Sequence, residues 1–177
     1  MRNPKSTTVL TAIFVLLLTL PTVAQTIDSK KSRIEFSVSN MGFRTVEGTM
    51  RGMRGTVRFD PDNIQNASFN VCVDPATVDT DNNTRDKHLR GKKFFEVEKH
   101  PTICFTSEKI KRTDNGLVAS GKLTMHGITK AVKIPFQHKG KTLTGTIKIL
   151  RSDYKLGPSG GMMVGKTVTV KIICVGN

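Results

Sequence analysis

Apolar and polar residues alternate along most of this chain. Ile34, Phe36 and Val38 are apolar while the residues between them are polar, and 166–175 shows the same pattern. Successive side chains of a β-strand point to opposite faces, so each such segment has one apolar and one polar face. The expected strands, eight in number, cover residues 33–40, 44–60, 67–74, 103–110, 116–125, 131–138, 142–151 and 166–175. The pattern predicts an all-β domain.

The second expected strand is long and contains Gly52 and Gly55, so we expect it to bend near one of them. Turn-forming residues separate several strands, as at 60–63, 114–116 and 139–140. Most connections are short, which indicates antiparallel neighbours.

One-sided antiparallel strands can close into a barrel or pack as two sheets. Closure removes exposed sheet edges, and a barrel of about eight strands can enclose one ligand. We therefore favour an eight-stranded antiparallel barrel, with a two-sheet sandwich as the alternative.

The alternation is interrupted at 84–99, which is highly charged and contains a few apolar residues. This segment predicts a short helical insertion between the third and fourth strands. Thr84 or Asp86 could cap its start. The insertion is expected to cover an end or flank of the barrel.

The apolar positions of the strands share one face, which would line the barrel interior. Those residues are Ile34, Phe36, Val38, Val57, Phe59, Phe69, Val71, Val73, Ile103, Phe105, Leu123, Met125, Val132, Ile134, Phe136, Ile147, Ile149, Val168, Val170 and Ile172. They could form a filled core or the wall of a ligand cavity, because eight strands lie at the size where both occur.

The first residues have the features of an export signal. Arg2 and Lys5 precede an apolar run, and 22–24 are small residues at the positions that a signal peptidase requires. We expect residues 1–24 to be a cleaved signal peptide and 25–177 to form one domain, in the periplasm or secreted. An uncleaved N-terminal anchor is the alternative.

Charge narrows the range of partners. Without Arg2 and Lys5, 26 basic and 14 acidic residues remain, a net charge of +12. Such a surface favours anionic partners, among them phospholipid surfaces and nucleic acids. The chain has no tryptophan and one tyrosine, whereas binders of single-stranded nucleic acid use exposed aromatic platforms. We therefore expect transient contact with anionic membranes and no nucleic-acid binding.

The cysteines and histidines indicate less about a disulfide or a metal site than the alternation does about the fold. Cys72 and Cys104 both fall on the outward face of strands that could pair, so a disulfide is conceivable, while Cys174 has inward parity. The four histidines show no paired-ligand spacing, and no metal site or cofactor is expected.

Gly157 to Gly165 is a flexible loop whose Met162 and Met163 suit either a lid at the barrel mouth or a plain hairpin.

Several motifs together resemble the YceI-like lipid/polyisoprenoid-binding family. They are Ile27-Asp28 with Ser32, Gly48 before Gly55 to Asp60, Val78-Asp79-Thr80, Arg85 to Leu89, Phe94-Phe95, Pro101 with Phe105 and Ser107, Gly121 to Val132, and Arg151, Asp153, Tyr154 and Gly157. The resemblance covers the whole chain after residue 24. It implies a periplasmic, lipocalin-like barrel that encloses a long isoprenoid chain.

Arg85, Asp86 and His88 look at first like a catalytic constellation. Their spacing equally suits a capped turn that holds the helix on the barrel, and an arginine could also bind a phosphate head group. We expect a structural role, with head-group contact as the alternative.

The favoured function is non-catalytic binding, transport or storage of a long-chain isoprenoid, a quinone-like lipid or a similar amphipathic lipid. An enzyme acting on such a lipid is the alternative, but the expected inward positions are almost wholly apolar and supply no acid–base pair. The oligomeric state stays open, with a homodimer among the choices.

Overall fold

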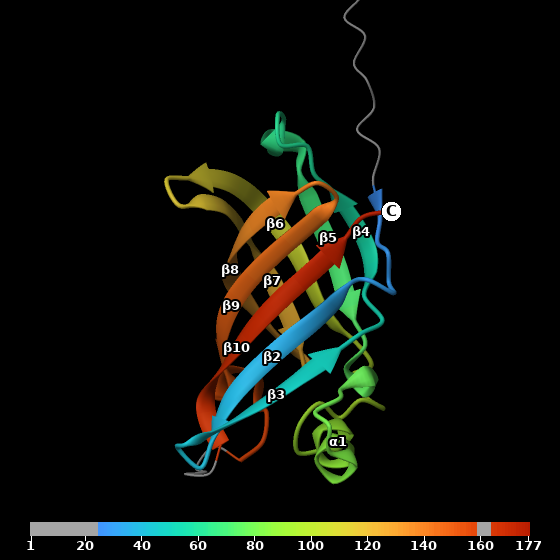
Figure 1. Ribbon diagram of the computed structural model, residues 1–177, viewed down its shortest axis with the longest axis vertical. Coiled ribbons are helices and arrows are strands. Elements are labelled where there is room, and N and C mark those ends of the chain that lie inside the picture. The colour runs from blue at the N-terminus through green and yellow to red at the C-terminus, as the bar shows by residue number, and fades with distance from the viewer. Residues whose placement is uncertain (1–24, 159–163) are drawn as a thin grey trace, which may run out of the picture.

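The computed structural model describes residues 25–158 and 164–177 of the chain. The predicted signal peptide, and the two methionines of the lid hypothesis, lie outside these residues. The described part is a β-sheet protein with one α-helix (Figure 1). Within it, no helix combines the length and hydropathy needed to cross a bilayer.

The structure contains ten strands rather than the predicted eight. They are β1 (Gln25–Thr26), β2 (Arg33–Asn40), β3 (Arg44–Met50), β4 (Arg54–Arg58), β5 (Ser68–Val73), β6 (Ile103–Thr113), β7 (Gly116–Met125), β8 (Ile128–Lys139), β9 (Thr142–Leu150) and β10 (Val164–Val175). The helical elements are η1 (Ile64–Asn66), η2 (Pro75–Thr77), α1 (Asn83–Arg90) and η3 (Arg151–Tyr154).

The two extra strands have simple causes. β1 pairs with β4 through only two residues, too few to give an alternation signal. The predicted strand 44–60 divides into β3 and β4 because Gly52 has a φ of +69° and turns the chain. Gly55 then lets β4 approach β5, since a Cβ at that position would overlap the Asn70 carbonyl oxygen.

All strands belong to one antiparallel sheet in the order β1-β4-β5-β6-β7-β8-β9-β10-β2-β3. The sheet curls around its apolar face, as Figure 1 shows. Isolated bridges join its two sides, Ile27 to Gly176 and Thr49 to Asp79. In the described residues β1 and β3 remain the sheet edges, so these bridges take the place of the complete closure that the sequence led us to favour.

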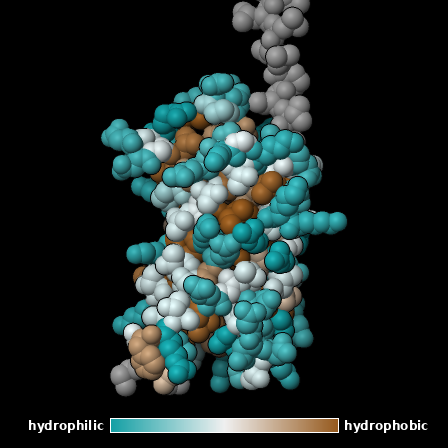
Figure 2. All heavy atoms as spheres, in the orientation of Figure 1, coloured by the Kyte–Doolittle hydropathy of each residue, from teal (hydrophilic) through white to brown (hydrophobic). Residues whose placement is uncertain are grey.

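The outward face carries the polar positions of the alternation. Glu35 in β2 opposes Lys171 in β10, and the two form an ion pair of 3.1 Å. Hydrogen bonds from Lys171, and then from Arg33, lower the pKa of the Glu35 carboxyl. Figure 2 accordingly shows a mostly hydrophilic surface with hydrophobic atoms at a few places on the viewed face.

Aromatic rings fill one end of the interior. Phe69 and Phe136 are buried, with ring centroids 5.3 Å apart. Phe59, just past the end of β4, lies edge-on to Phe136 at 5.6 Å, and its ring centroid is 4.8 Å from that of His138. These four rings form the aromatic cluster. Its three phenylalanines belong to the largest core cluster in the described chain, whereas His138 is exposed beside them.

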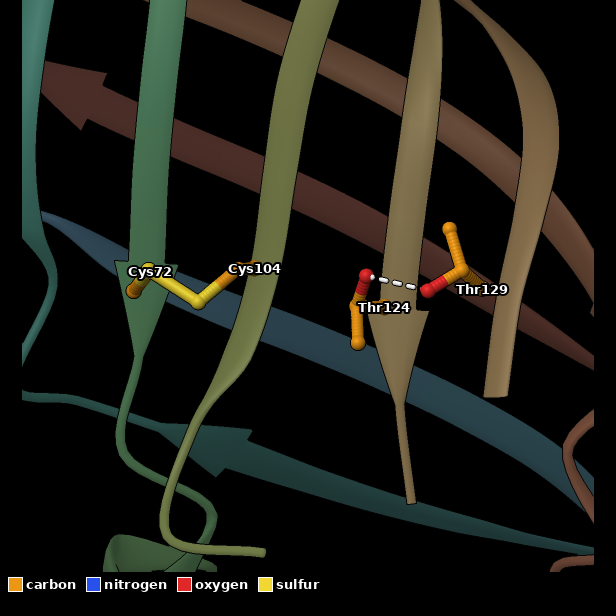
Figure 3. The surroundings of a disulfide bond; sticks show 4 residues. All are labelled: Cys72, Cys104, Thr124 and Thr129. Carbon is orange, nitrogen blue, oxygen red and sulfur yellow. Dashed lines mark hydrogen bonds between the residues drawn. A yellow bond between two sulfur atoms is a disulfide. The ribbon is translucent and has the colours of Figure 1, made fainter. Parts of the chain in front are cut away.

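A disulfide joins Cys72 and Cys104 across β5 and β6, where the two residues oppose each other in register. The next positions in the same row are Thr124 of β7 and Thr129 of β8, whose hydroxyls are 2.8 Å apart. Figure 3 shows the disulfide and this threonine pair on neighbouring strands. On the outward side of the sheet, the disulfide thus joins β5 to β6 and the threonine pair joins β7 to β8.

The predicted helical insertion is present as α1, between β5 and β6. Its cap is Asn82, whose side chain accepts a hydrogen bond of 2.9 Å from the Arg85 amide. The expected caps, Thr84 and Asp86, were wrong because the helix starts earlier and both lie inside it. Figure 1 places α1 at one end of the curled sheet.

Candidate ligand cavity

The curled sheet encloses a cavity of about 230 Å³. Strand side chains of inward parity form most of its wall. Every predicted lumen residue except Phe59 and Val132 contributes to the lining. Whether these residues contact a ligand stays a prediction.

The two exceptions are apolar but lie elsewhere in the core. Phe59 follows the end of β4 and belongs to the aromatic cluster. Val132 of β8 packs against the core cluster that contains Met125 and Tyr154. Parity places a side chain on one face of a sheet, but neighbouring side chains decide whether it reaches open space.

Other lining residues were missed by the lumen prediction. They include Met50, Met53, Leu89, Phe94, Phe95, Ala119, Leu143, Leu156, Val164 and Cys174. Some come from irregular segments to which strand alternation does not apply. Met53, only 1% exposed, follows the Gly52 turn, and Leu89, Phe94 and Phe95 come from the insertion. In the sequence, the feature that could have indicated Leu89, Phe94 and Phe95 as lining residues is that they are apolar within a highly charged segment.

One charged side chain, Arg151, lies in the lining. Its guanidinium donates hydrogen bonds to the carbonyls of Leu156, Gly165 and Val164, at 2.6, 2.8 and 3.1 Å. Each of its nitrogens therefore already has a protein acceptor. The side chain holds η3 to the start of β10, so the site presents an almost wholly apolar wall.

Arg85 and Asp86 anchor α1. The buried Asp86 carboxylate accepts hydrogen bonds from both the amide and the hydroxyl of Thr80. Arg85 donates to the Thr80 hydroxyl at 2.8 Å and to the Thr80 carbonyl. Both side chains therefore bind Thr80, which precedes the helix. His88, in contrast, is exposed on the helix surface. The three predicted residues thus form no common site.

The fold brings together two histidines that are far apart in sequence. His100 precedes β6, His126 lies in the turn between β7 and β8, and Glu96 stands between them. In the sequence the four histidines are scattered, and no metal site was expected from their spacing. The cluster could not be predicted because only the pairing of β6, β7 and β8 makes its residues neighbours.

Cys174 has the inward position that its parity predicted. It is 6% exposed and lies in the cavity wall. Burial raises the pKa of its thiol from 9.0 to about 11, although a hydrogen bond with Ser32 partly opposes the shift. The thiol is therefore protonated at neutral pH and acts as a small apolar group.

Solved structures share this architecture. BcnA of Burkholderia cenocepacia superposes with a TM-score of 0.75 at 26% identity, over 85% of this chain and 99% of BcnA. A domain from Saccharophagus degradans, described as polyisoprenoid binding and implicated in plant cell wall breakdown, gives a TM-score of 0.66. It covers 87% of this chain and 98% of that domain, and its identity of 15% shows the fold alone.

Curated relatives are closer in sequence but match less of the chain. A UPF0312 protein of Pectobacterium atrosepticum is 38% identical over 101 residues, which are 57% of this chain and 53% of that protein. A UPF0312 protein of Photorhabdus laumondii is 37% identical over 99 residues, 56% and 52% of the two chains. This chain thus spans about half the length of the curated relatives it matches.

The model of the YceI-like domain matches residues 25–175. This range includes every strand and the insertion. The chain therefore belongs to the YceI-like domain family.

Proposed function

We propose that this protein binds a long-chain isoprenoid or a similar amphipathic lipid in its cavity, as a non-catalytic carrier or store. The observation that carries the proposal is the composition of the cavity wall, in which apolar side chains from the strands and the insertion meet. The Saccharophagus degradans domain, described as polyisoprenoid binding, has the same fold and supports the same ligand class.

Hydrophobic burial alone can supply the affinity. Each methylene that leaves water contributes about 0.8 kcal/mol. Ten buried methylenes contribute about 8 kcal/mol before the costs of association and ordering are subtracted. A prenyl chain therefore needs no strong polar contact in the cavity.

The absence of catalysis is part of the proposal. General acid–base chemistry needs a titratable group within reach of a reacting atom. The charged side chain in the wall, Arg151, is engaged with three carbonyls, and Asp86 is engaged with Thr80. Because both charged groups are engaged with protein atoms, these contacts favour a lipid-binding protein over an enzyme.

We further propose that the protein works in the periplasm or is secreted after cleavage before Gln25. The Cys72–Cys104 disulfide supports this location, because disulfides persist mainly in oxidising compartments. Cell fractionation and N-terminal sequencing of the recovered protein test it. A chain that keeps residue 1 and stays in the cytoplasm would contradict it.

The decisive experiment is organic extraction of protein purified from its native host, followed by mass spectrometry. We expect a long-chain lipid in a fixed ratio to the protein. Recovery of no such lipid from natively expressed protein would refute the proposal.

A matched pair of variants ties the lipid to the cavity. Ile147 lines the cavity, whereas the adjacent Thr146 of β9 is exposed. Ile147→Trp should reduce the lipid content several-fold because the indole occupies the space, and Thr146→Trp should leave it unchanged. Since the chain has no tryptophan, the emission of each introduced indole also reports whether it is buried. Equal lipid content in both variants, with a buried indole at 147, would place the lipid elsewhere.

A further inference from the structure

Three metal-ligating side chains converge at the end of the sheet beside the insertion. The ligand atoms of Glu96, His100 and His126 all lie within 4.8 Å of one another. A carboxylate oxygen of Glu96 is 3.7 Å from Nε2 of His100 and 3.6 Å from Nε2 of His126. These three residues do not line the lipid cavity.

His126 is held in the orientation that metal-binding histidines adopt. Its Nδ1 lies 3.0 Å from the backbone carbonyl of Tyr154. A carbonyl only accepts, so Nδ1 carries the proton and donates, and the neutral ring keeps its Nε2 lone pair. That lone pair is on the side of Glu96. A backbone partner of this kind orients the imidazole in metal sites.

The backbone is shaped to bring the rings together. His126 and Gly127 have φ values of +50° and +71°, and Glu96 has a φ of +45°. A Cβ at residue 127 would meet Cε1 of His100 at 2.8 Å, so the glycine admits the ring. The two imidazoles are edge-to-face with centroids 5.1 Å apart. Positive φ at both 126 and 127 is the geometry of a two-residue type I′ hairpin turn, here between the paired residues Met125 and Ile128.

The ligand set identifies the class of ion. Two imidazole nitrogens and one carboxylate oxygen suit zinc and similar transition metals, whereas Ca²⁺ and Mg²⁺ prefer oxygen ligands. Tetrahedral bonds of about 2.0–2.1 Å put neighbouring ligand atoms roughly 3.4 Å apart. The two separations from Glu96, 3.6 and 3.7 Å, are close to that geometry.

We propose that Glu96, His100 and His126 form a three-ligand site for a divalent transition metal, with zinc the best match. The remaining coordination position would take water or a donor from another molecule. Lys99 also lies 4.0 Å from Glu96, but its side chain is 70% exposed and can turn into solvent when a cation binds.

The bound metal would join two segments that are far apart in the sequence. Glu96 and His100 belong to the segment between α1 and β6, and His126 belongs to the β7–β8 turn. Phe94 and Phe95, directly before Glu96, line the lipid cavity. Metal binding would therefore fix the part of the insertion that forms one end of the cavity wall.

The test is isothermal titration of Zn²⁺ into tag-free, EDTA-treated protein covering residues 25–177. We expect one ion per chain and a rise in melting temperature. Glu96→Gln, His100→Ala and His126→Ala should each weaken binding by at least tenfold. His88→Ala removes an exposed histidine outside the cluster and should leave Zn²⁺ binding unchanged.

A second measurement does not depend on the variants. Co²⁺ bound by two imidazoles and a carboxylate in a tetrahedral site should give an intense visible absorption band in the unmodified protein, and Zn²⁺ should abolish it. No saturable binding, or binding that His88→Ala removes and the cluster variants keep, would overturn the proposal. In that case the cluster is a carboxylate–histidine contact that serves only the fold.

Discussion

At the scale of single residues, the environment of a side chain changes its chemistry. Cys174 is a reactive residue type, yet at 6% exposure its thiol has a pKa of about 11. Native Cys174 should therefore react slowly with alkylating reagents at neutral pH, since the thiolate is the nucleophile.

The Cys174 shift predicts a loss of stability at alkaline pH. The folded state holds the thiol proton more tightly than the unfolded state, in which the thiol has its ordinary pKa of 9.0. This stabilisation is complete below about pH 9 and is lost as the pH rises towards 11. The full effect is about 2–3 kcal/mol.

Urea unfolding of the wild type and of Cys174→Ala at pH 8 and pH 11 measures the effect. The wild type should lose more stability over this interval than the variant, because all other titrating groups are shared. Equal losses would contradict the shift.

Tyr154 predicts a stabilising substitution. The side chain is 2% exposed, and among the described residues no hydrogen-bond partner reaches its hydroxyl. A buried polar group left unpaired costs about 1–3 kcal/mol. Tyr154→Phe should therefore raise the free energy of unfolding by about 1 kcal/mol, as measured by urea denaturation. A decrease would mean that the hydroxyl has a partner, such as a bound ligand.

At the scale of elements, α1 depends on one buried carboxylate. Asp86 receives two hydrogen bonds from Thr80, and Arg85 adds two contacts to the same residue. The helix has only eight residues, which is too short to be stable alone in water. Its position on the sheet therefore rests on these contacts and on the apolar residues that follow it.

Asp86→Ala should lower the free energy of unfolding by about 2–4 kcal/mol, because it leaves the buried Thr80 donors without an acceptor. Lys87→Ala, an exposed change on the same helix, should cost under about 0.5 kcal/mol. Urea denaturation measures both. An Asp86→Ala protein of unchanged stability that had lost its lipid would instead assign Asp86 to the head group.

At the scale of the whole molecule, charge and exposed apolar residues suit a membrane surface. The chain after residue 24 has a net charge of +12. Met41 and Phe43 in the β2–β3 turn are 50% and 75% exposed. Figure 1 places this turn at the same end of the molecule as α1.

We predict binding to vesicles that contain phosphatidylglycerol and weaker binding to pure phosphatidylcholine vesicles, measured by co-sedimentation. Raising the salt to about 0.5 M should release the protein, since the Debye length falls well below 10 Å. Phe43→Ser should reduce binding several-fold, and Phe43→Leu should keep most of it. Salt-insensitive binding, or equal loss in both variants, would contradict this docking mode.

Much of the fold was predictable because a β-strand has a simple period. Alternation located most strands to within a few residues and identified most of the strand residues in the cavity wall, since parity fixes the face of each side chain. It failed at residues 44–60, where a glycine of positive φ divides one segment between two parts of the sheet. Two-residue β1 was too short to be seen.

By itself, the sequence determined that this chain forms a one-sided antiparallel sheet with an apolar interior and a charged insertion, because these follow from local periodicity. Only the tertiary structure decided which residues meet. Register placed Cys72 opposite Cys104, packing assigned Asp86 to Thr80, and strand pairing brought His126 beside Glu96 and His100. Such contacts depend on residues that are distant in the chain, and no local pattern records them.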